Sequence, residues 1–325
     1  MNDDEKNAAS VPPAPTREWQ LIEKMLLAAQ DDQRRARTWG IVFKSLGLLY
    51  LFALLFLLTS STESTSPSKS SDHVALVEVD GVLMPGGDAD ADTIVEGLRD
   101  AFEAKHAKAV IMRINSPGGS PVQAGIIYDE MRRLRAGHPD KKLYAVISDM
   151  GASGGYYIAA AADEIYVDKA SIVGSIGVIM NGFGAEDLIH KIGVEDRTMT
   201  AGENKAILSP FAPVNEAQKK HVQGLLDTIH GQFIAAVKEG RGNRLKEDPA
   251  MFSGLFWTGE QAVQLGLADG LGTASHVARD IVGVEDIVDY SYQRSPLEKL
   301  AERFGAQAGA SLAAHLGVNS SMTLR

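Results

Sequence analysis

The sequence predicts an α/β protein in which short parallel strands alternate with helices. From residue 74 onward, apolar segments of strand length alternate with longer segments of helical periodicity. Such alternation is typical of βαβ units, whose strands form a parallel sheet. The chain has 325 residues, of which 45% are hydrophobic, and this is enough for one globular domain of about 200 residues with appendages.

The composition excludes several classes of function. The formal net charge of -10 provides no broad basic surface, so nucleic acid is not expected as a partner. Cysteine is absent, which excludes a thiol nucleophile, a disulfide framework and cysteine-ligated metal sites. Covalent catalysis would therefore have to use an oxygen or nitrogen nucleophile.

An apolar run at residues 39–59 precedes the alternating region and is long enough to span a bilayer as a transmembrane anchor. Basic residues are concentrated before this run, and Lys69 is the nearest basic residue after it. The positive-inside rule therefore places residues 1–38 in the cytoplasm and the bulk of the chain outside. A cleaved signal peptide is the alternative, but the leading region is too long for one and no Ala-x-Ala site follows.

Three further segments flank the predicted domain. Within the cytoplasmic segment, apolar residues recur at helical spacing over 17–36, which predicts an amphipathic helix. Residues 60–72 are rich in Ser and Thr and are predicted to form a flexible linker. A folded domain is expected at 73–293, followed by a C-terminal helical extension at 294–325.

The elements of the domain follow from periodicity and from their boundary residues. Residues 88–92 lack the glycine and the final glutamate of a calcium loop, so they are interpreted as an acidic loop or helix start, and no metal site is predicted. A capping box at 258–261 begins a helix that ends near Gly266. The predicted strands are 74–79, 109–114, 143–148, 165–167 and 176–180, and the predicted helices are 93–105, 122–136, 156–162 and 216–239.

Ser153 is a candidate nucleophile, because it lies where a predicted strand gives way to a predicted helix. Residues 151–155 are glycine or alanine apart from Ser153. Small neighbours let a substrate carbonyl approach the hydroxyl, and the free N–H groups of the first helical turn favour negative charge there. Taken alone, a segment of this composition is more often an ordinary strand-to-helix turn than an active site.

A second motif, Pro117-Gly118-Gly119, follows the predicted strand at 109–114. A turn of this composition exposes backbone N–H groups that bulkier side chains would shield. In acyl transfer such donors hold the developing oxyanion. Pro-Gly-Gly turns are also common without any catalytic role, so the interest of this one lies in its place one βα unit before Ser153.

A serine nucleophile needs a base, and the sequence alone does not mark one. A lysine serves only if burial brings its pKa from about 10.4 to near 7 or 8. Lys205 lies between a possible turn and an apolar segment, whereas most lysines here have charged neighbours. None of the histidines lies in a small-residue or turn setting that suggests chemistry: His73, His106, His138, His190, His221, His230, His276 and His315.

Taken together, the motifs resemble those of the bacterial signal peptide peptidase A family of membrane-anchored serine proteases. The resemblance covers roughly residues 74–290 and is to the short, single-domain members. The motifs that carry it are the segments at 115–119, 151–157, 174–178, 256–262 and 266–270, together with Gly202 and Lys205.

The resemblance implies a ClpP/crotonase-like α/β fold and a Ser/Lys dyad. Ser153 would be the nucleophile, and Lys205 would accept its proton. Ser175 would orient Lys205 through a hydrogen bond, and the backbone N–H groups of Gly119 and Gly154 would form the oxyanion hole, with Gly118 as the alternative to Gly119. No cofactor is implied.

The function implied by the resemblance is hydrolysis of peptide bonds in hydrophobic segments, chiefly signal peptides left in the membrane after secretion. The location implied is the bacterial cytoplasmic (inner) membrane, with a single anchor and the catalytic domain on the extracytoplasmic side. The implied partners are hydrophobic peptides, membrane lipid around the anchor, and further copies of the chain, with serine and lysine supplied within one chain or by neighbouring chains.

Three alternatives fit part of the sequence. An α/β-hydrolase esterase also uses Gly-x-Ser-x-Gly, but it requires a later acid and then a catalytic histidine. A crotonase-type acyl-CoA enzyme would share the implied fold, yet an anchor and a serine at position 153 fit it poorly. A non-catalytic membrane scaffold with a protease fold is the third alternative, although none of the expected catalytic positions is missing.

Overall fold

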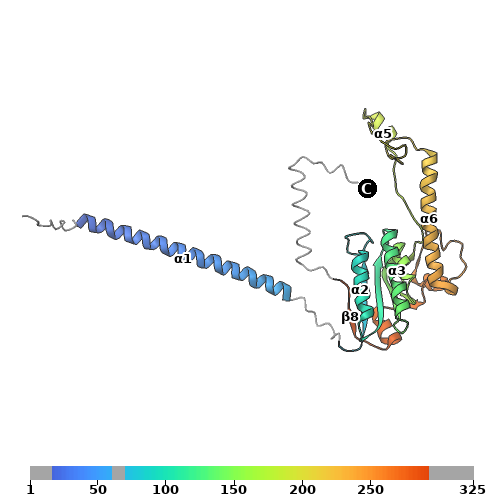
Figure 1. The fold of residues 1–325 in the computed structure, drawn as a ribbon, viewed down its shortest axis with the longest axis horizontal. Helices are drawn as coiled ribbons and strands as arrows, with labels where there is room; N and C mark the ends of the chain where they lie inside the picture. Colours follow the sequence, from blue (N-terminus) through green and yellow to red (C-terminus); the bar gives the residue numbers. More distant parts are fainter. Residues whose placement is uncertain (1–16, 61–69, 293–325) are drawn as a thin grey trace, which may run out of the picture. The chain divides into compact units, whose positions relative to one another are not determined.

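The computed structural model describes residues 17–60 and 70–292, which fall into two compact units, Met1–Thr65 and Ser66–Arg325. In the first unit the described residues form one helix, α1 (Arg17–Ser60), which contains the predicted helix at 17–36 and the apolar run at 39–59 (Figure 1). Within the described part of the chain, no helix has the length and apolar character needed to cross a membrane. Most of the predicted linker and the whole extension at 294–325 lie outside the described residues.

The second unit is built on an eight-stranded sheet, which confirms the predicted α/β class with parallel strands. Strands β6, β5, β3, β2, β1 and β8 follow one another across the sheet, with β4 pairing with β3 and β7, and every pair is parallel except the antiparallel β5 and β6. The strands are β1 (His73–Asp80), β2 (Ala107–Ser116), β3 (Leu143–Ala152), β4 (Glu164–Val167), β5 (Ile172–Gly174), β6 (Phe256–Thr258), β7 (Gly270–Leu271) and β8 (Ile287–Asp289).

Helices α2, α3, α6, α7 and α8 begin at residues whose side chains accept hydrogen bonds from free backbone N–H groups, whereas α4 and α5 have no such cap. The Asp90 carboxylate accepts from the N–H groups of Asp92 and Thr93, so the acidic segment at 88–92 is a helix start, and Thr258 and Gln261 form the predicted capping box. The helices of this unit are α2 (Ala91–Glu103), α3 (Pro121–Gly137), α4 (Gly154–Ala159), α5 (Glu186–Lys191), α6 (Glu216–Arg241), α7 (Gly259–Leu265) and α8 (Ala274–His276), with a 3-10 turn at Gly242–Arg244 and a π-helical turn at Val277–Val282.

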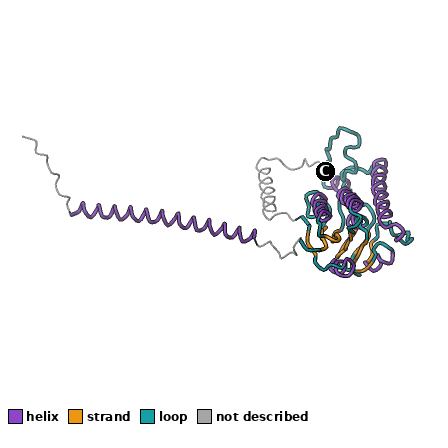
Figure 2. The backbone as a smooth tube through the Cα atoms, turned by 60° about the horizontal axis from the view of Figure 1, so that its bottom comes forward, coloured by secondary structure: helices purple, strands orange, loops and turns teal. Residues whose placement is uncertain are grey.

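The two faces of the sheet are covered differently. Successive side chains of a strand point to opposite faces. Val77 and Met112 belong to the main core with the buried residues of α2, α3 and α4, whereas Leu76 and Ile111 belong to a smaller core with residues from α8 and the π-helical turn. Figure 2 shows the strands grouped between these helical segments. The larger helical layer therefore covers the face of the sheet on which α4, the helix directly after Ser153, also packs.

Strand β3 pairs with β2 along one edge and has two different neighbours along the other. Its first half pairs with β4 from Tyr144 to Ile147, and its end pairs with β5 at Met150 to Ala152. This second pairing extends the strand beyond the predicted residue 148. The predicted strand at 176–180 is wrong, because the extended backbone is interrupted at Ser175, which has a left-handed φ of 50°.

Residues 178–215, here called the arm, leave the sheet after β5 and return at the start of α6. The arm carries α5, which lies at the end of α6 distant from the sheet (Figure 1). It is tied by a hydrogen bond from Ala185 N to Pro210 O at 2.6 Å and by one from Gln218 Nε2 to Asn204 Oδ1 at 3.0 Å. Exposed apolar side chains on the arm are Ile179, Met180, Phe183, Leu188, Ile192, Val194, Met199, Leu208, Phe211 and Val214.

Candidate active site

Ser153 lies directly after β3 and directly before α4, as predicted, and its backbone is strained. Its φ of 51° and ψ of -123° are rare for a residue with a side chain. Two hydrogen bonds hold it there: Ser153 N donates to Gly174 O at 2.8 Å, and Tyr157 N donates to Ser153 O at 2.9 Å. Strain of this kind costs on the order of 1–3 kcal/mol and is concentrated at functional sites. The half-buried hydroxyl is thus displayed at a fixed position.

The Pro-Gly-Gly turn lies against Ser153 at a distance that only glycine allows. A Cβ placed on Gly118 would come within 2.7 Å of Ser153 Cβ and 2.6 Å of Gly154 N. A Cβ on Gly119 would come within 2.3 Å of Leu83 O. Both glycines also have positive φ angles, 95° and 147°. The turn and the start of α4 are therefore packed backbone against backbone.

The direction of each N–H group distinguishes Gly119 from Gly118 as an oxyanion donor. Gly118 N already donates to Ser116 Oγ at 3.1 Å. Leu83 N donates to Gly118 O at 2.9 Å and Ser120 N donates to Leu83 O at 2.8 Å, so in this parallel bridge the N–H of Gly119 points away from Leu83. Gly154 is the first residue of α4, where an N–H has no intrahelical acceptor. The geometry favours Gly119 and Gly154 as the pair of donors.

Ser175 lies beside the Ser153 backbone on the neighbouring strand. Ala152 pairs with Gly174, and each is followed by a serine with a left-handed φ. Ser175 N donates to Leu255 O at 2.7 Å, which fixes the residue against the segment before β6. The structure therefore brings Ser153, Ser175 and the backbone of Gly119 and Gly154 to the same end of the sheet.

A pocket of about 150 Å³ opens beside Ser153, and its surface combines apolar side chains with polar groups that include Gln232. Its wall includes Tyr157 and Phe233, whose ring centroids are 4.9 Å apart. Tyr128 packs edge-on against Tyr157, and burial, with the nearby Glu239 charge, raises the pKa of Tyr128 to about 12, so its hydroxyl stays neutral and donates to Ala236 O at 3.2 Å. The other apolar side chains of the lining are Pro121, Ala124, Val178, Ile179 and Ile229.

Lys205 lies on the arm and is exposed. Its backbone N–H donates to Gly202 O at 3.1 Å, which forms the turn expected from the sequence. Among the residues that the structure describes, none forms a hydrogen bond or ion pair with the Lys205 ammonium group, and Lys205 does not line the Ser153 pocket. Of the five predicted site residues, four lie together in a single chain, and Lys205 lies away from them.

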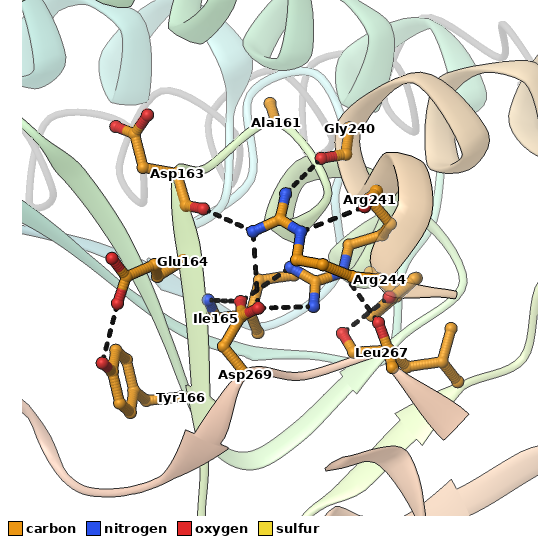
Figure 3. A network of polar contacts seen from close by, with 12 residues as sticks. Ala161, Asp163, Glu164, Ile165, Tyr166, Gly240, Arg241, Arg244, Leu267 and Asp269 are labelled. Atoms are coloured by element: carbon orange, nitrogen blue, oxygen red, sulfur yellow. Dashed lines mark hydrogen bonds and ion pairs between the residues drawn. The ribbon is translucent and has the colours of Figure 1, made fainter. Parts of the chain in front are cut away.

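A buried ion pair beneath α4 was not identified from the sequence. Arg241, which is 1% exposed, donates to both oxygens of Asp269 at 2.7 and 2.9 Å, and Arg244 approaches the same carboxylate at 3.4 Å (Figure 3). Burial alone would raise the pKa of Asp269, but the hydrogen bonds and charge of Arg241 outweigh it and the pKa is lowered. Tyr156 donates from α4 to Leu267 O at 2.7 Å. These contacts hold the base of α6 and the helix after Ser153 together.

The chain is similar to a family of peptidases and to several named proteins. A model of peptidase family S49 matches residues 136–283, a stretch that includes Ser153, Ser175 and Lys205. A presumed protease from Synechocystis sp. is 34% identical over 209 residues, which cover 64% of this chain and 73% of that protein. The chain belongs to peptidase family S49. The family resemblance inferred from the motifs is therefore confirmed.

Other relatives of this S49 chain differ in length and name. A protein from Enterococcus faecium, provisionally named signal peptide peptidase SppA, is 29% identical over 218 residues, or 65% of this chain and 63% of that protein. The Na(+)/H(+) antiporter NhaA of Brucella melitensis is 44% identical over 257 residues, or 75% of this chain. The chain spans only 34% of the length of the Brucella protein, and the antiporter name describes that protein alone.

Proposed function

We propose that this S49 chain is a serine endopeptidase that uses Ser153 and Lys205 as a dyad. The observation that carries the proposal is Ser153 itself, held in a strained conformation beside the outward N–H of Gly119 and the first N–H of α4, at a pocket lined largely by apolar side chains. A nucleophile, two oxyanion donors and a side-chain pocket are the parts that acyl transfer needs. Lys205 supplies the base that the pocket itself lacks.

The reaction proposed runs in two halves. Ser153 Oγ attacks the scissile carbonyl carbon while its proton passes to the neutral Lys205 amine, and the carbonyl oxygen becomes an oxyanion held by Gly119 and Gly154 N–H. Collapse of this intermediate breaks the peptide bond, and Lys205 returns the proton to the leaving amine. Water then attacks the acyl carbon while Lys205 accepts one of its protons. Collapse breaks the ester bond to Ser153 Oγ, and Lys205 returns the proton to that oxygen, which releases the acid product and restores the hydroxyl and the neutral amine.

We propose that Lys205 reaches the Ser153 of a neighbouring copy. The proposal is supported by the exposed position of Lys205 on the arm and by the apolar side chains that the arm leaves in solvent. Exposed apolar groups in such number are typical of a contact surface. Burial of the lysine at that contact would also disfavour its charged form, as a base requires.

Complementation of two inactive variants tests where the dyad forms. Full chains carrying Ser153→Ala and Lys205→Met are expected to be inactive separately and to recover part of the activity when co-expressed and purified together. Each mixed pair can combine an intact serine with an intact lysine only if these come from different chains. A co-assembled mixture that stays inactive, or a fully active monomer in analytical ultracentrifugation, would show that the dyad forms within one chain.

The proposed substrates are hydrophobic segments, chiefly remnant signal peptides, cleaved at the outer face of the cytoplasmic membrane. Three observations support this: the apolar lining of the pocket, the apolar run at 39–59 preceded by basic residues, and the similarity to an Enterococcus protein named as a signal peptide peptidase. The run would anchor the chain with its N-terminus in the cytoplasm. Protease accessibility of each end in sealed vesicles would test that topology.

Covalent labelling tests the proposed nucleophile. A peptide phosphonate with an apolar side chain is expected to modify Ser153, and mass spectrometry of the digested adduct would locate it. The full chain with Ser153→Ala should take up no label. A label at another serine would refute the proposal, and the absence of any label would favour the non-catalytic scaffold.

The oxyanion donor gives a prediction with a matched control. Gly119→Ala is expected to lower kcat by about 10²- to 10³-fold, because its Cβ would displace the Leu83 backbone and turn the N–H away from the oxyanion. Gly125→Ala on α3 is the control, since that glycine has open space around it and a helical alanine is favoured by about 1 kcal/mol. Steady-state kinetics on a fluorogenic peptide would measure both. Equal activity of the two variants would remove Gly119 from the proposed oxyanion hole.

The pocket volume predicts a preference for medium-sized apolar side chains at the residue before the cleaved bond. A pocket of about 150 Å³ holds a leucine-sized group, and Phe233 closes one side of it. Phe233→Ala is expected to raise kcat/KM for tryptophan relative to leucine at this position by about tenfold or more. Phe256→Ala, at an exposed phenylalanine on β6, is the control. An unchanged ratio would mean that the substrate side chain binds elsewhere.

The esterase alternative is less well supported by this geometry. It needs a histidine beside Ser153, and among the described residues no histidine lines the pocket. His230 is adjacent to Ile229 of the pocket wall, but its Nε2 bonds to the carbonyl of Ile176.

A further inference from the structure

A hydrogen bond links α6 to the root of the arm close to the proposed active site. His230 Nε2 lies 3.0 Å from the carbonyl oxygen of Ile176, so the ring nitrogen donates this bond. Ile176 is 0% exposed and lies beyond the end of β5, where the sheet no longer supplies partners. A buried carbonyl without a partner is costly. His230 therefore provides the hydrogen-bond donor that the buried Ile176 carbonyl would otherwise lack after the end of β5.

The segment that His230 holds contains consecutive parts of the proposed site. Gly174 O accepts the Ser153 N–H at 2.8 Å, and Ser175 is the residue expected to orient the lysine. Gly177 and Val178 then line the pocket beside Ser153. These residues are adjacent in the chain. A rotation of the peptide group between Ile176 and Gly177 would therefore move Ser175, which precedes it, and Val178 of the pocket wall, which follows it.

The same hydrogen bond joins two segments that both contribute residues to the pocket. Ile229 and Phe233, which lie on either side of His230 along α6, line the same pocket as Gly177 and Val178. Gly177 has little room to adjust, since a Cβ on it would come within 3.0 Å of Gly254 Cα. His230 thus joins the two walls of the pocket at the point where the arm leaves the domain.

We propose that His230 is a positioning residue for acyl transfer, which fixes the peptide after Ile176 and through it Ser175 and Val178. The inference rests on the proposed Ser/Lys function, and His230 itself touches neither the substrate nor the reacting atoms. Its action is structural but local, because it sets the geometry of two parts of the site and leaves the sheet unaffected. The role also explains a half-buried histidine in a setting that gave no sequence signal for chemistry.

Three variants of the full chain test the inference. His230→Leu removes the donor, His230→Gln keeps an amide donor at a similar reach, and His221→Leu removes an exposed histidine from the same helix. His230→Leu is expected to lower kcat and the rate of Ser153 phosphonylation by roughly tenfold to a hundredfold, the cost of a small misplacement in an active site. His230→Gln should recover most of this loss, and His221→Leu should resemble the wild type.

Hydrogen exchange of residues 174–180 gives a readout that does not depend on catalysis. Faster exchange in this segment in His230→Leu, with the sheet strands unchanged, is expected alongside the lower kcat. Unchanged exchange, unchanged phosphonylation, or failure of His230→Gln to recover would each overturn the inference. If the wild type takes up no phosphonate, the proposed function falls, and the exchange comparison then decides by itself whether His230 holds the segment.

Discussion

Lys205→Met is expected to lower peptide hydrolysis by about 10³- to 10⁶-fold while leaving the fold of the chain unchanged. The loss follows because, among the described residues, no histidine, lysine or carboxylate lines the pocket beside Ser153, and a dyad fails when either member is removed. The fold is expected to survive because the Lys205 side chain is exposed and its ammonium group makes no hydrogen bond or ion pair within the described part of the chain. Single-turnover phosphonylation and steady-state kinetics would measure the loss.

Lys219→Met provides the matched control for this prediction. Lys219 is also an exposed lysine close to the arm, in the first turn of α6, with a 3.8 Å ion pair to Glu216. Its replacement removes the same charge from the same region and is expected to leave hydrolysis within about twofold of the wild type, as for an exposed ion pair of little energetic weight. Substantial activity in Lys205→Met would refute the dyad and would favour an esterase-type mechanism instead.

The parts of the fold that the sequence predicts correctly depend on local rules. The alternation of apolar segments predicts the first four strands, and the Asp90 and Thr258 caps mark helix starts through bonds to residues two or three positions away. Ser153 is found for the same reason, since small residues at a strand-to-helix turn are visible in one short segment. Local patterns were sufficient wherever the deciding contact was near in sequence.

The sequence-based predictions fail where the local structure depends on a contact with a residue far away in the sequence. Residues 176–180 have the apolar pattern of a strand, yet the strand ends at Gly174, because Ser175 takes a left-handed φ and bonds to Leu255, eighty residues later. Lys205 was predicted from the family motif, but no local pattern could show that it lies away from Ser153 in a single chain. The pair of Arg241 and Asp269 joins residues with no common periodicity, although Asp269 lies in a segment that fits the family pattern.

Asp269→Asn is expected to destabilise the domain by about 3–5 kcal/mol at pH 7, because it leaves the buried Arg241 guanidinium without its counter-charge. The pKa of Asp269 is lowered in the folded state, so the folded protein favours the ionised form. The contribution of this carboxylate to stability is therefore complete above its unfolded pKa of about 3.9 and is lost as the pH falls through the folded value. Urea unfolding of wild type and variant at a series of pH values should show the difference shrinking below about pH 4.

Two further variants test whether the loss of stability comes from the buried ion pair or from removing a negative charge anywhere in the domain. Asp280→Asn removes a carboxylate from an exposed ion pair with Arg279 and is expected to change the unfolding midpoint little. Replacing both buried partners with apolar residues, as in Arg241→Met with Asp269→Leu, should recover much of the stability lost in Asp269→Asn, since no buried charge then remains unpaired. If the double variant is as unstable as the single one, the hydrogen bonds from Arg241 to Gly266 and from Ile165 to Asp269 matter more than the ion pair. In that case the network holds α6 and α4 through backbone contacts, and its charge is secondary.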